Sequence, residues 1–417
     1  MMETQEGYKK TKIGWIPEEW DVVLFGGVVQ EYKKKSSQDN EFEVLTSSRK
    51  GLMRQKDYYG DNRLTQRNTQ GFNICPPGYI TYRSRSDDAS FVFNQNTLGF
   101  TGLISKYYPV FSVVEGDNDF FVLLCNWLAP HFSKYSVGTS QVVLSFKALS
   151  SCKIPLPPLP EQQKIASILS TVDKKIQSIE EQINQTEQLK KGLMNKLLTE
   201  GIGHTEFKDT KIGRIPKSWD VVKLGKIISH TKLGVNLKAS VQNEGVPILK
   251  MGNLIRGGFN FSKIERIDDQ VVEKYSDYLL KEGDFLFNTR NTPELVGKSA
   301  TWKDNNRQMI YNSNILRINF IDISNSFYLS HYFSSSIGWS KLKRISKNTT
   351  SVGAIYSKDL VGLQVPLPPI PEQQKITSIL STVDGKASVL QSKKSAYETL
   401  KKGLMAQLLT GQMRVKI

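Results

Sequence analysis

Several short segments of this chain carry side chains that can read DNA, and they follow stretches typical of β-strands. Arginine can fork onto guanine, asparagine and glutamine onto adenine, and lysine, serine and threonine suit phosphates. The strands are indicated by alternating apolar runs bounded by glycine or polar residues, such as 78–82, 283–287 and 315–320. Polar residues also fill solvated loops by default, so for any one of these residues simple exposure is the commoner explanation. The candidate contact residues are Arg49, Lys50, Arg54, Arg83, Arg85, Thr139, Ser140, Gln141, Lys250, Asn253, Arg256, Asn288, Arg290, Asn291, Lys347, Thr349 and Thr350.

An enzyme would need a catalytic or cofactor-binding motif, and the nearest matches are incomplete. Residues 292–299, TPELVGKS, resemble a phosphate-binding loop but have Thr292 where the first glycine belongs. Residues 75–78, CPPG, lack the Asn or Asp that would hold a target amino group in a methyltransferase. We therefore predict that this chain binds without catalysing.

Metal binding is the other chemistry to weigh. Asp21, Glu31 and Lys33 have a spacing that resembles a metal-dependent nuclease site, but the second half of the chain has His230 in place of one carboxylate. The cysteines and histidines have no paired spacing, so neither a disulfide framework nor a zinc motif is indicated. They are Cys75, Cys125, Cys152, His131, His204, His230 and His331. We expect no metal and no catalytic residue here.

The element that must position the candidate loops is a long helix that the chain carries twice. Residues 155–176 and 366–387 are identical at 18 of 22 positions. Their apolar residues step by four and three, which is typical of a coiled-coil seam. From Pro160 to Thr199 the first copy spans 40 residues, or about 60 Å as a helix. The predicted pairing residues are Ile165, Leu169, Val172, Ile176, Ile179, Ile183, Ile376, Leu380, Val383 and Leu390.

A second repeat marks where each globular part begins. Residues 12–23, KIGWIPEEWDVV, match residues 211–222, KIGRIPKSWDVV, at nine of 12 positions. The chain therefore has the order globular part, helix, globular part, helix, and the sequence between the matching ends diverges. Two modules with one scaffold and two targets would show this pattern. Because 120–134 and 327–343 are typical of helices, we predict an α+β fold rather than βαβ units.

Charge and hydropathy narrow the class of partner. Lys and Arg number 56 against 40 Asp and Glu, a net charge of +16, which favours a polyanion such as nucleic acid. A merely basic protein without such a partner is the alternative. The N-terminus lacks the apolar core of a secretory signal, and the longest apolar-rich stretch, 120–129, is too short to span a bilayer. We expect a cytoplasmic protein without a membrane partner.

These features together resemble the specificity (S) subunit of type I restriction-modification systems. The resemblance rests on the doubled PLPPLPEQQK helix, the KIGxIPxxWxVVxLG motif, GDFLFNTRNTPELVGKSA at 283–300, and the loops at 138–141 and 349–351. It covers essentially the whole chain, and the doubled helix is its most specific part. The departures are small: Lys174 corresponds to Gly385 and Ile176 to Ala387, which softens the second helix locally.

The resemblance implies an α+β fold with two target-recognition domains of mixed strands and helices, 1–154 and 202–365. Two long conserved helices, 155–201 and 366–417 with its C-terminal tail, would separate them and pair as an antiparallel coiled coil with a pseudo-two-fold internal repeat. Each domain would read one half of a bipartite site in double-stranded DNA. The helices would dock two methyltransferase (M) subunits, to which restriction (R) subunits add. S-adenosylmethionine, ATP and Mg²⁺ would belong to those partners.

Two other interpretations stay open on the sequence. The chain could serve a methylation-only or other phage-defence complex, or it could be a non-catalytic scaffold for RNA or protein. Two homologous modules on one rod suit a duplex better, because a second half-site lies at a fixed distance along a straight ligand. The resemblance does not carry over which residue contacts which base, since recognition loops differ between family members.

Overall fold

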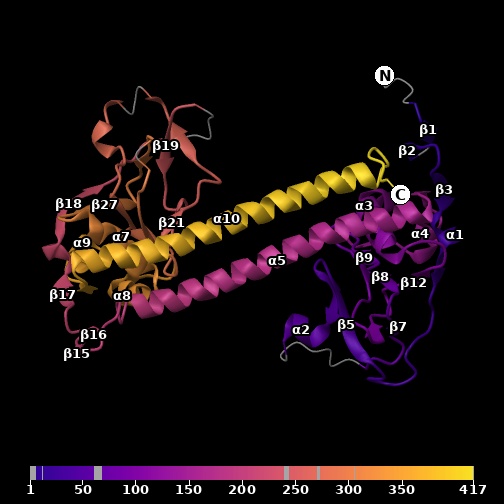
Figure 1. Cartoon of the computed structure of the whole chain (residues 1–417), viewed down its shortest axis with the longest axis horizontal. Coiled ribbons are helices and arrows are strands. Elements are labelled where there is room, and N and C mark those ends of the chain that lie inside the picture. Colours follow the sequence, from indigo (N-terminus) through magenta and orange to yellow (C-terminus); the bar gives the residue numbers. More distant parts are fainter. Residues whose placement is uncertain are drawn as a thin grey trace. The chain divides into compact units, whose positions relative to one another are not determined.

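The computed structural model describes residues 6–11, 13–60, 68–238, 244–269, 273–304 and 306–416 (Figure 1). Lys12, which begins the first copy of the KIG motif, lies outside the described residues. Contacts divide the chain into unit 1, Met1–Ile179 with Lys393–Ile417, and unit 2, Glu180–Ser392. Each long helix therefore contributes a part to each unit. Among the described residues, none of the helices combines the length and the apolar composition that a membrane-spanning segment needs.

Unit 1 is built on two four-stranded sheets with the orders β10-β8-β12-β4 and β6-β5-β11-β7, and on the pairs β1-β2, β13-β9 and β14-β3. Its strands are β1 (Tyr8–Thr11), β2 (Gly14–Pro17), β3 (Asp21–Leu24), β4 (Val29–Glu31), β5 (Glu43–Ser48), β6 (Gly51–Arg54), β7 (Asn73–Cys75), β8 (Ile80–Tyr82), β9 (Arg85–Ser86), β10 (Phe93–Gln95), β11 (Gly102–Ile104), β12 (Val110–Val113), β13 (Val142–Val143) and β14 (Lys153–Leu156). Its shorter helices are α1 (Phe25–Val28), α2 (Gln55–Tyr59), α3 (Asn118–Phe132), the 3₁₀ turn η2 (Ser133–Tyr135) and α4 (Phe146–Ser150).

The core of unit 1 forms between the β8 sheet and α3, the helix predicted at 120–134. Asp117 caps α3 by accepting a hydrogen bond from the Phe120 N–H at 2.8 Å. Phe120 and Phe121 then face inward and join Phe25 in an aromatic cluster that also contains Tyr82. This cluster fixes β8, and β8 ends directly before the candidate residue Arg83.

Unit 2 has a four-stranded sheet, β18-β27-β23-β25, two three-stranded sheets, β22-β19-β26 and β24-β29-β28, and the pairs β15-β16, β17-β30 and β20-β21. Its strands are β15 (Phe207–Thr210), β16 (Gly213–Pro216), β17 (Asp220–Lys223), β18 (Ile228–Leu233), β19 (Val246–Leu249), β20 (Leu254–Ile255), β21 (Gly258–Phe259), β22 (Glu265–Ile267), β23 (Phe285–Asn288), β24 (Arg290–Asn291), β25 (Ser299–Thr301), β26 (Ile310–Tyr311), β27 (Ile315–Phe320), β28 (Lys347–Asn348), β29 (Gly353–Ala354) and β30 (Gln364–Leu367). Its shorter helices are η3 (Leu224–Lys226), η4 (Ser276–Tyr278), α7 (Ile323–Ser334), α8 (Ser336–Ile345) and α9 (Ser357–Val361). The α+β class is confirmed.

The helical segment predicted at 327–343 is two helices rather than one. The chain breaks at Ser335, whose backbone is extended and whose hydroxyl accepts from the Gly338 N–H at 3.1 Å, capping α8. Three consecutive serines at 334–336 were the available signal, because serine favours helix N-caps over helix interiors.

Each of the two long helices, α5 (Leu159–Leu197) and α10 (Ile370–Leu408), has 39 residues. Each begins one residue before a proline, Pro160 or Pro371, and ends before a glycine in the left-handed region, Gly201 at φ 68° and Gly411 at φ 72°. A Cβ at Gly201 would lie 2.4 Å from the Glu372 carboxylate, and one at Gly411 would lie 2.4 Å from Pro17. Both positions therefore require glycine for conformation and for space.

The first turn of each long helix is anchored by a carboxylate beneath a tryptophan. Trp20 Nε1 donates to Glu161 at 2.9 Å in unit 1, and Trp219 Nε1 donates to Glu372 at 2.9 Å in unit 2. Arg414 Nε also donates to Glu161 at 2.9 Å, and this hydrogen bond raises the pKa of the guanidinium. Glu161 is buried and Glu372 is half-buried, and a carboxylate removed from water needs such donors, so these contacts explain why Glu follows the proline in both copies.

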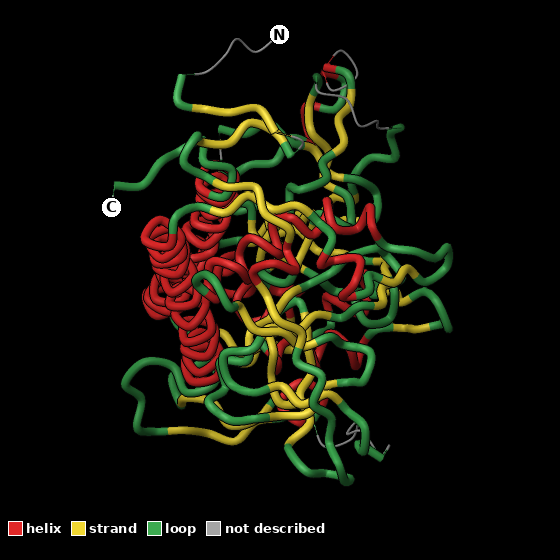
Figure 2. Tube along the Cα trace, turned by 90° about the vertical axis from the view of Figure 1, so that its right-hand side faces the viewer, coloured by secondary structure: helices red, strands yellow, loops and turns green. Residues whose placement is uncertain are grey.

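Within each unit, part of α5 lies beside part of α10; the two helices are labelled in Figure 1 and are among the helices coloured red in Figure 2. In unit 1 the start of α5 shares a buried cluster with the end of α10, and in unit 2 the end of α5 shares one with the start of α10. Repeated ion pairs add to both contacts: Lys401 to Asp173 at 2.6 Å and Lys190 to Asp384 at 2.5 Å. The two helices are therefore antiparallel in each unit.

The predicted pairing residues divide by burial. Eight are buried: Ile165, Leu169, Val172, Ile179, Ile376, Leu380, Val383 and Leu390. Ile176 and Ile183 are half-buried. An uninterrupted coiled-coil seam along the full length of both helices stays a prediction.

Candidate nucleic-acid interface

The first candidate segment in unit 1 is the turn between β5 and β6. Ser48 pairs with Gly51, so Arg49 and Lys50 form a two-residue hairpin turn. The Ser48 hydroxyl donates to the Gly51 carbonyl and accepts from the Lys50 N–H, both at 3.0 Å. Two exposed cationic side chains are thus carried at the tip of a hydrogen-bonded turn.

The second segment follows β8. Arg83 comes directly after this strand and Arg85 opens β9; both are exposed. Because Arg85 pairs with Val143 on β13, the exposed loop of residues 139–141, Thr139, Ser140 and Gln141, lies close to these arginines. The Arg85 guanidinium lies over the Tyr107 ring, 3.9 Å from its centroid, and this contact limits the directions in which the arginine side chain can point.

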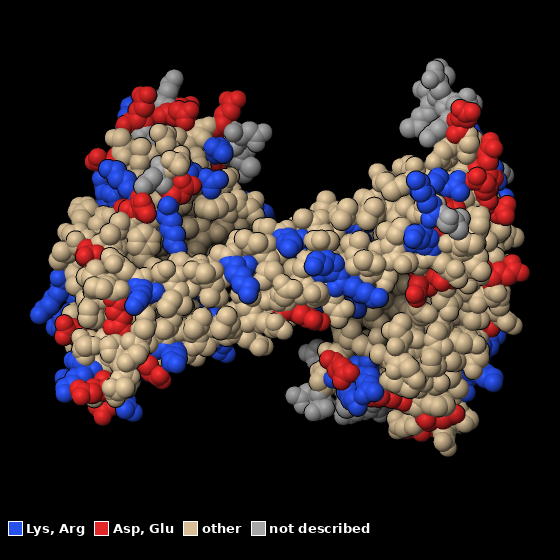
Figure 3. Space-filling view, viewed as in Figure 1, with Lys and Arg blue, Asp and Glu red and all other residues tan. Residues whose placement is uncertain are grey.

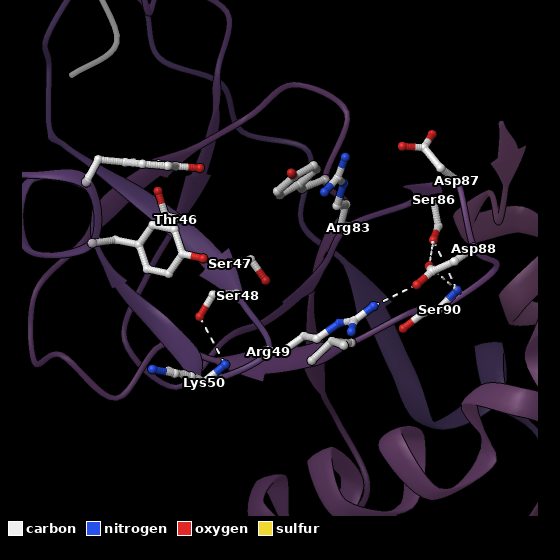
Figure 4. Close-up of a pocket in the computed structure, with 14 residues that line it drawn as sticks. Thr46, Ser47, Ser48, Arg49, Lys50, Arg83, Ser86, Asp87, Asp88 and Ser90 are labelled. Atoms are coloured by element: carbon white, nitrogen blue, oxygen red, sulfur yellow. Dashed lines mark hydrogen bonds and ion pairs between the residues drawn. The ribbon is translucent and has the colours of Figure 1, made fainter. Parts of the chain in front are cut away.

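A cavity of about 580 Å³ lies among these segments (Figure 4). Gln141 reaches one of its aspartates, since its Nε2 donates to Asp87 Oδ1 at 3.2 Å. The lining residues are Thr46, Ser47, Ser48, Arg49, Lys50, Tyr58, Tyr59, Arg83, Ser86, Asp87, Asp88, Ser90, Val92 and Tyr108. Residues predicted from separate stretches of sequence are therefore brought together in unit 1.

Asp88 links the hairpin turn to the segment after β9. Its Oδ2 lies 2.6 Å from Arg49 Nη2, while its Oδ1 accepts from the Ser86 hydroxyl at 2.7 Å and the Ser90 N–H at 3.1 Å. These hydrogen bonds, that from Ser86 foremost, and the charge of Arg49 hold the pKa of Asp88 below its ordinary value. The cavity thus presents a fixed, ionised acceptor beside its cationic donors.

Unit 2 gathers the corresponding segments by the same kind of strand pairing. Arg290 on β24 pairs with β29, and β29 pairs with β28, which carries Lys347. Thr349 and Thr350 are exposed in the turn between β28 and β29, where Thr349 Oγ1 accepts from the Val352 N–H at 3.1 Å. Arg290 and Lys347 are exposed as well, and Asn291 beside them is half-buried.

Two predicted contact residues are buried with their amides engaged. Asn253 is 7% exposed, and its Nδ2 donates to the Asn260 and Lys263 carbonyls at 3.0 and 2.7 Å. Asn288 is 0% exposed, and its Nδ2 donates to the Arg290 and Asn314 carbonyls at 3.0 and 3.2 Å. Both shape the loops rather than offer their side chains to a ligand.

Three predicted cations are also held by the protein. Arg256 donates to a carbonyl at the end of α7 at 2.8 Å and lies over the Trp339 ring at 4.4 Å, and burial lowers its pKa. Arg54 and Lys250 form ion pairs with glutamates on neighbouring strands. The side chains of Arg54 and Lys250 are 41% and 35% exposed, whereas the ion-paired Arg49 and Lys347 are 75% and 59% exposed. We therefore leave Arg54, Lys250 and Arg256 out of the proposed interface.

The sequence interpretation missed the acidic and aromatic lining of the unit 1 cavity. Asp87 and Asp88 follow a strand directly, but acidic residues are not expected where phosphates bind. Tyr58 and Tyr59 on α2 are 45% and 43% exposed and meet edge to face at 4.7 Å between ring centroids. Their signal was an aromatic pair in a short polar helix.

The near-motifs for catalysis do not form sites among the described residues. Residues 292–299 run into strand β25 instead of a helix, so the phosphate cradle of a helix N-terminus is missing. Asp21 and Glu31 belong to different sheets, and Glu31 pairs with Lys33 at 3.2 Å. In the ranges that the structure describes, no group of three His, Cys, Asp or Glu is placed to hold a metal.

The cysteines have a structural role. Cys75, Cys125 and Cys152 are buried and free. Burial raises the pKa of Cys75 to about 12 and that of Cys152 to about 11, so both stay protonated, unreactive thiols at neutral pH.

Surface charge is distributed in groups. On the face shown in Figure 3, Lys and Arg lie in several separate clusters among Asp and Glu. The basic side chains behind the net charge of +16 therefore do not form one continuous patch on that face.

Comparison with known proteins decides the family. A family model, the type I restriction modification DNA specificity domain, matches the chain twice, over residues 17–188 and 216–397. The chain belongs to the type I restriction-modification specificity subunits. The type I restriction enzyme MjaVIII specificity subunit of Methanocaldococcus jannaschii is 30% identical over 99% of this chain and 97% of its own length. The putative MjaX specificity subunit of the same organism is 28% identical over 99% and 98%.

A solved structure supports the fold of this specificity subunit. The type I restriction-modification S subunit from M. genitalium matches 100% of this chain and 99% of its own, with a TM-score of 0.60 at 11% identity. The similarity concerns the path of the backbone, because so low an identity carries no correspondence between individual contact residues.

Proposed function

We propose that each unit of this specificity subunit reads one half of a bipartite site in double-stranded DNA. The observation that carries the proposal is a repeated arrangement. In both units a short strand with an exposed arginine, Arg85 or Arg290, pairs with a short strand beside an exposed Thr- and Ser-containing loop. The repeated scaffold holds chemically different loops, which suits two modules with different half-sites.

The proposed interface uses the exposed members of the predicted set other than Arg256, together with the half-buried Asn291. They are Arg49, Lys50, Arg83, Arg85, Thr139, Ser140 and Gln141 in unit 1, and Arg290, Asn291, Lys347, Thr349 and Thr350 in unit 2. Methyl transfer and cleavage would be carried out by M and R subunits, which would bind S-adenosylmethionine, ATP and Mg²⁺.

Two methyltransferase subunits would dock on the long helices at repeated positions. Leu189 on α5 in unit 2 and Leu400 on α10 in unit 1 correspond in the repeat, and they are 51% and 48% exposed. Three residues further on, Gly192 and Gly403 lie inside helices, and a Cβ added at either would meet no atom within 4 Å. Glycine inside a helix is less favourable than alanine by roughly 1 kcal/mol. A partner backbone that approaches these two positions closely would explain why both are glycine. One such patch in each unit fits two copies of one partner.

Replacing either glycine should raise the stability of the free chain and weaken its assembly with the methyltransferase. Gly192→Gln and Gly403→Gln should stabilise the free chain by about 0.5–1 kcal/mol, because glutamine is a better helix former and its Cβ meets no neighbour. The same substitutions should weaken binding of the methyltransferase, each at one of two sites. Chemical unfolding and the mass of the assembled complex measure the two effects.

Gly385→Gln is the matched control, because Gly385 is also a glycine inside α10 with open space around it. It should raise stability equally and leave assembly unchanged. Normal assembly of all three variants would place the methyltransferase elsewhere.

Salt dependence tests the nucleic-acid partner. If the exposed cations contact phosphates, the logarithm of the binding constant for a matched duplex should fall linearly with the logarithm of salt concentration, by about 0.9 per contact. Arg85→Gln or Lys347→Gln should reduce that slope by about one contact wherever the side chain meets a phosphate. Fluorescence anisotropy at several salt concentrations is the measurement. A flat profile for the wild-type chain, or equal preference for RNA, would refute duplex DNA as the partner.

A further inference from the structure

We propose that Arg49 and Asp88 together read one G·C base pair in the half-site of unit 1. The inference rests on the proposed function, since it assumes that this cavity faces the major groove. It names the base pair that the cavity selects and adds a carboxylate to the residues that determine specificity.

The spacing of the two side chains matches the edge of the base pair. Arg49 Nη2 and Asp88 Oδ2 are 2.6 Å apart. In the major groove, guanine presents two adjacent acceptors, N7 and O6, and cytosine presents the N4 amino donor. O6 and N4 are themselves joined by a hydrogen bond of about 2.9 Å. A guanidinium over guanine and a carboxylate over cytosine can therefore keep nearly the separation they already have.

Both side chains retain hydrogen-bonding capacity for this contact. Asp88 Oδ1 is held by Ser86 and Ser90, whereas Oδ2 meets Arg49 and has a second lone pair for an amino group. The guanidinium has five N–H donors, so it can serve the carboxylate and the guanine together. The side chains of Arg49 and Asp88 are 75% and 59% exposed, so a base edge can reach them.

The chemistry of Asp88 argues for a base edge and against a phosphate. Its hydrogen bonds with Ser86 and Ser90 and its pairing with Arg49 keep it ionised, and an ionised carboxylate repels a phosphate oxygen. Carboxylates in DNA-reading surfaces instead accept from cytosine N4. An A·T pair is the poorer match, because adenine offers a single acceptor, N7, where guanine offers two for the arginine fork.

The test uses the complex with its methyltransferase subunits and a set of duplexes in which each base pair of the unit 1 half-site is changed in turn. The wild type should discriminate against replacement of one particular G·C pair. Arg49→Ala should lower that discrimination by about 10-fold or more, because a good bidentate contact with guanine supplies discrimination of this order. Asp88→Asn should lower discrimination at the same position, because an amide NH₂ in the place of Oδ2 cannot accept from cytosine N4. The Asp88→Asn side chain would still accept from Ser86 and Ser90 through its amide oxygen, so the loop should persist.

Asp57→Asn is the matched control, since Asp57 is exposed on the neighbouring helix α2 and does not line the cavity. It should leave every position unchanged. The inference is overturned if the half-site contains no G·C pair, or if Asp88→Asn leaves discrimination intact while binding is normal. Failure of the wild-type complex to bind any duplex specifically would instead refute the proposed function.

Discussion

Leu169→Ala and Leu380→Ala should each lower the free energy of unfolding of the free chain by roughly 2–5 kcal/mol, the cost of a cavity in a packed core. The two leucines correspond in the repeated helices, are 0% exposed, and belong to the buried clusters of unit 1 and unit 2 respectively. Alanine keeps the helix preference, so the loss reports packing alone. Urea unfolding followed by circular dichroism measures it.

Leu189→Ala and Leu400→Ala are the controls on the same two helices. Their side chains are 51% and 48% exposed, so stability should change by no more than about 0.5 kcal/mol. Equal losses in buried and exposed variants would mean that the long helices do not use the faces described here. A loss only for Leu169→Ala would show that the end of α5 and the start of α10 do not pack in unit 2.

The presence and the core of each long helix could be predicted because their signals are local, although the helices begin four residues inside the predicted segments. The repeated sequence and the apolar steps of four and three lie within one continuous segment, and the first turn of each helix carries a glutamate. The strands at 80–82 and 315–320 were visible for the same reason, since alternation and turn residues adjoin them. The hydrogen-bonding role of Glu161 could not be predicted in the same way, because its partners Trp20 and Arg414 are far away in sequence.

The site was predictable only in part, since exposure depends on tertiary contacts. Asn253 and Asn288 carry side chains suited to adenine, but the fold uses their amides to satisfy buried carbonyls. Arg256 likewise lies over the Trp339 ring and donates a hydrogen bond to a carbonyl at the end of α7. Conversely, Asp88 becomes a candidate only when the fold sets it 2.6 Å from Arg49, 39 positions away along the chain.

Exchanging the recognition segment of one unit should change one half of the target site completely. Residues 29–150 run from the start of β4 to the end of α4 and include the interface proposed for unit 1. Replacing them by the equivalent segment of another specificity subunit keeps β3, β14 and both long helices, which hold the segment at its ends. The new unit 1 should then select the donor's half-site, since its contact residues come from the donor.

The reciprocal exchange in unit 2 is the matched control. Residues 228–361 run from the start of β18 to the end of α9, between the paired strands β17 and β30. Their replacement should change the other half-site and leave the first as it was. If an exchanged chain no longer assembles with its partners, moving the junctions into the neighbouring loops should restore assembly. The paired strands would still hold both ends of the exchanged segment.

The most direct measurement is the sequence of all methylated sites in cells that express this chain with its methyltransferase subunits, as wild type and with each exchange. The account predicts a bipartite motif for the wild type, with one half altered by the unit 1 exchange and the other half altered by the unit 2 exchange. A motif in which a single exchange alters both halves, or neither, would contradict the claim that each unit reads one half of the site.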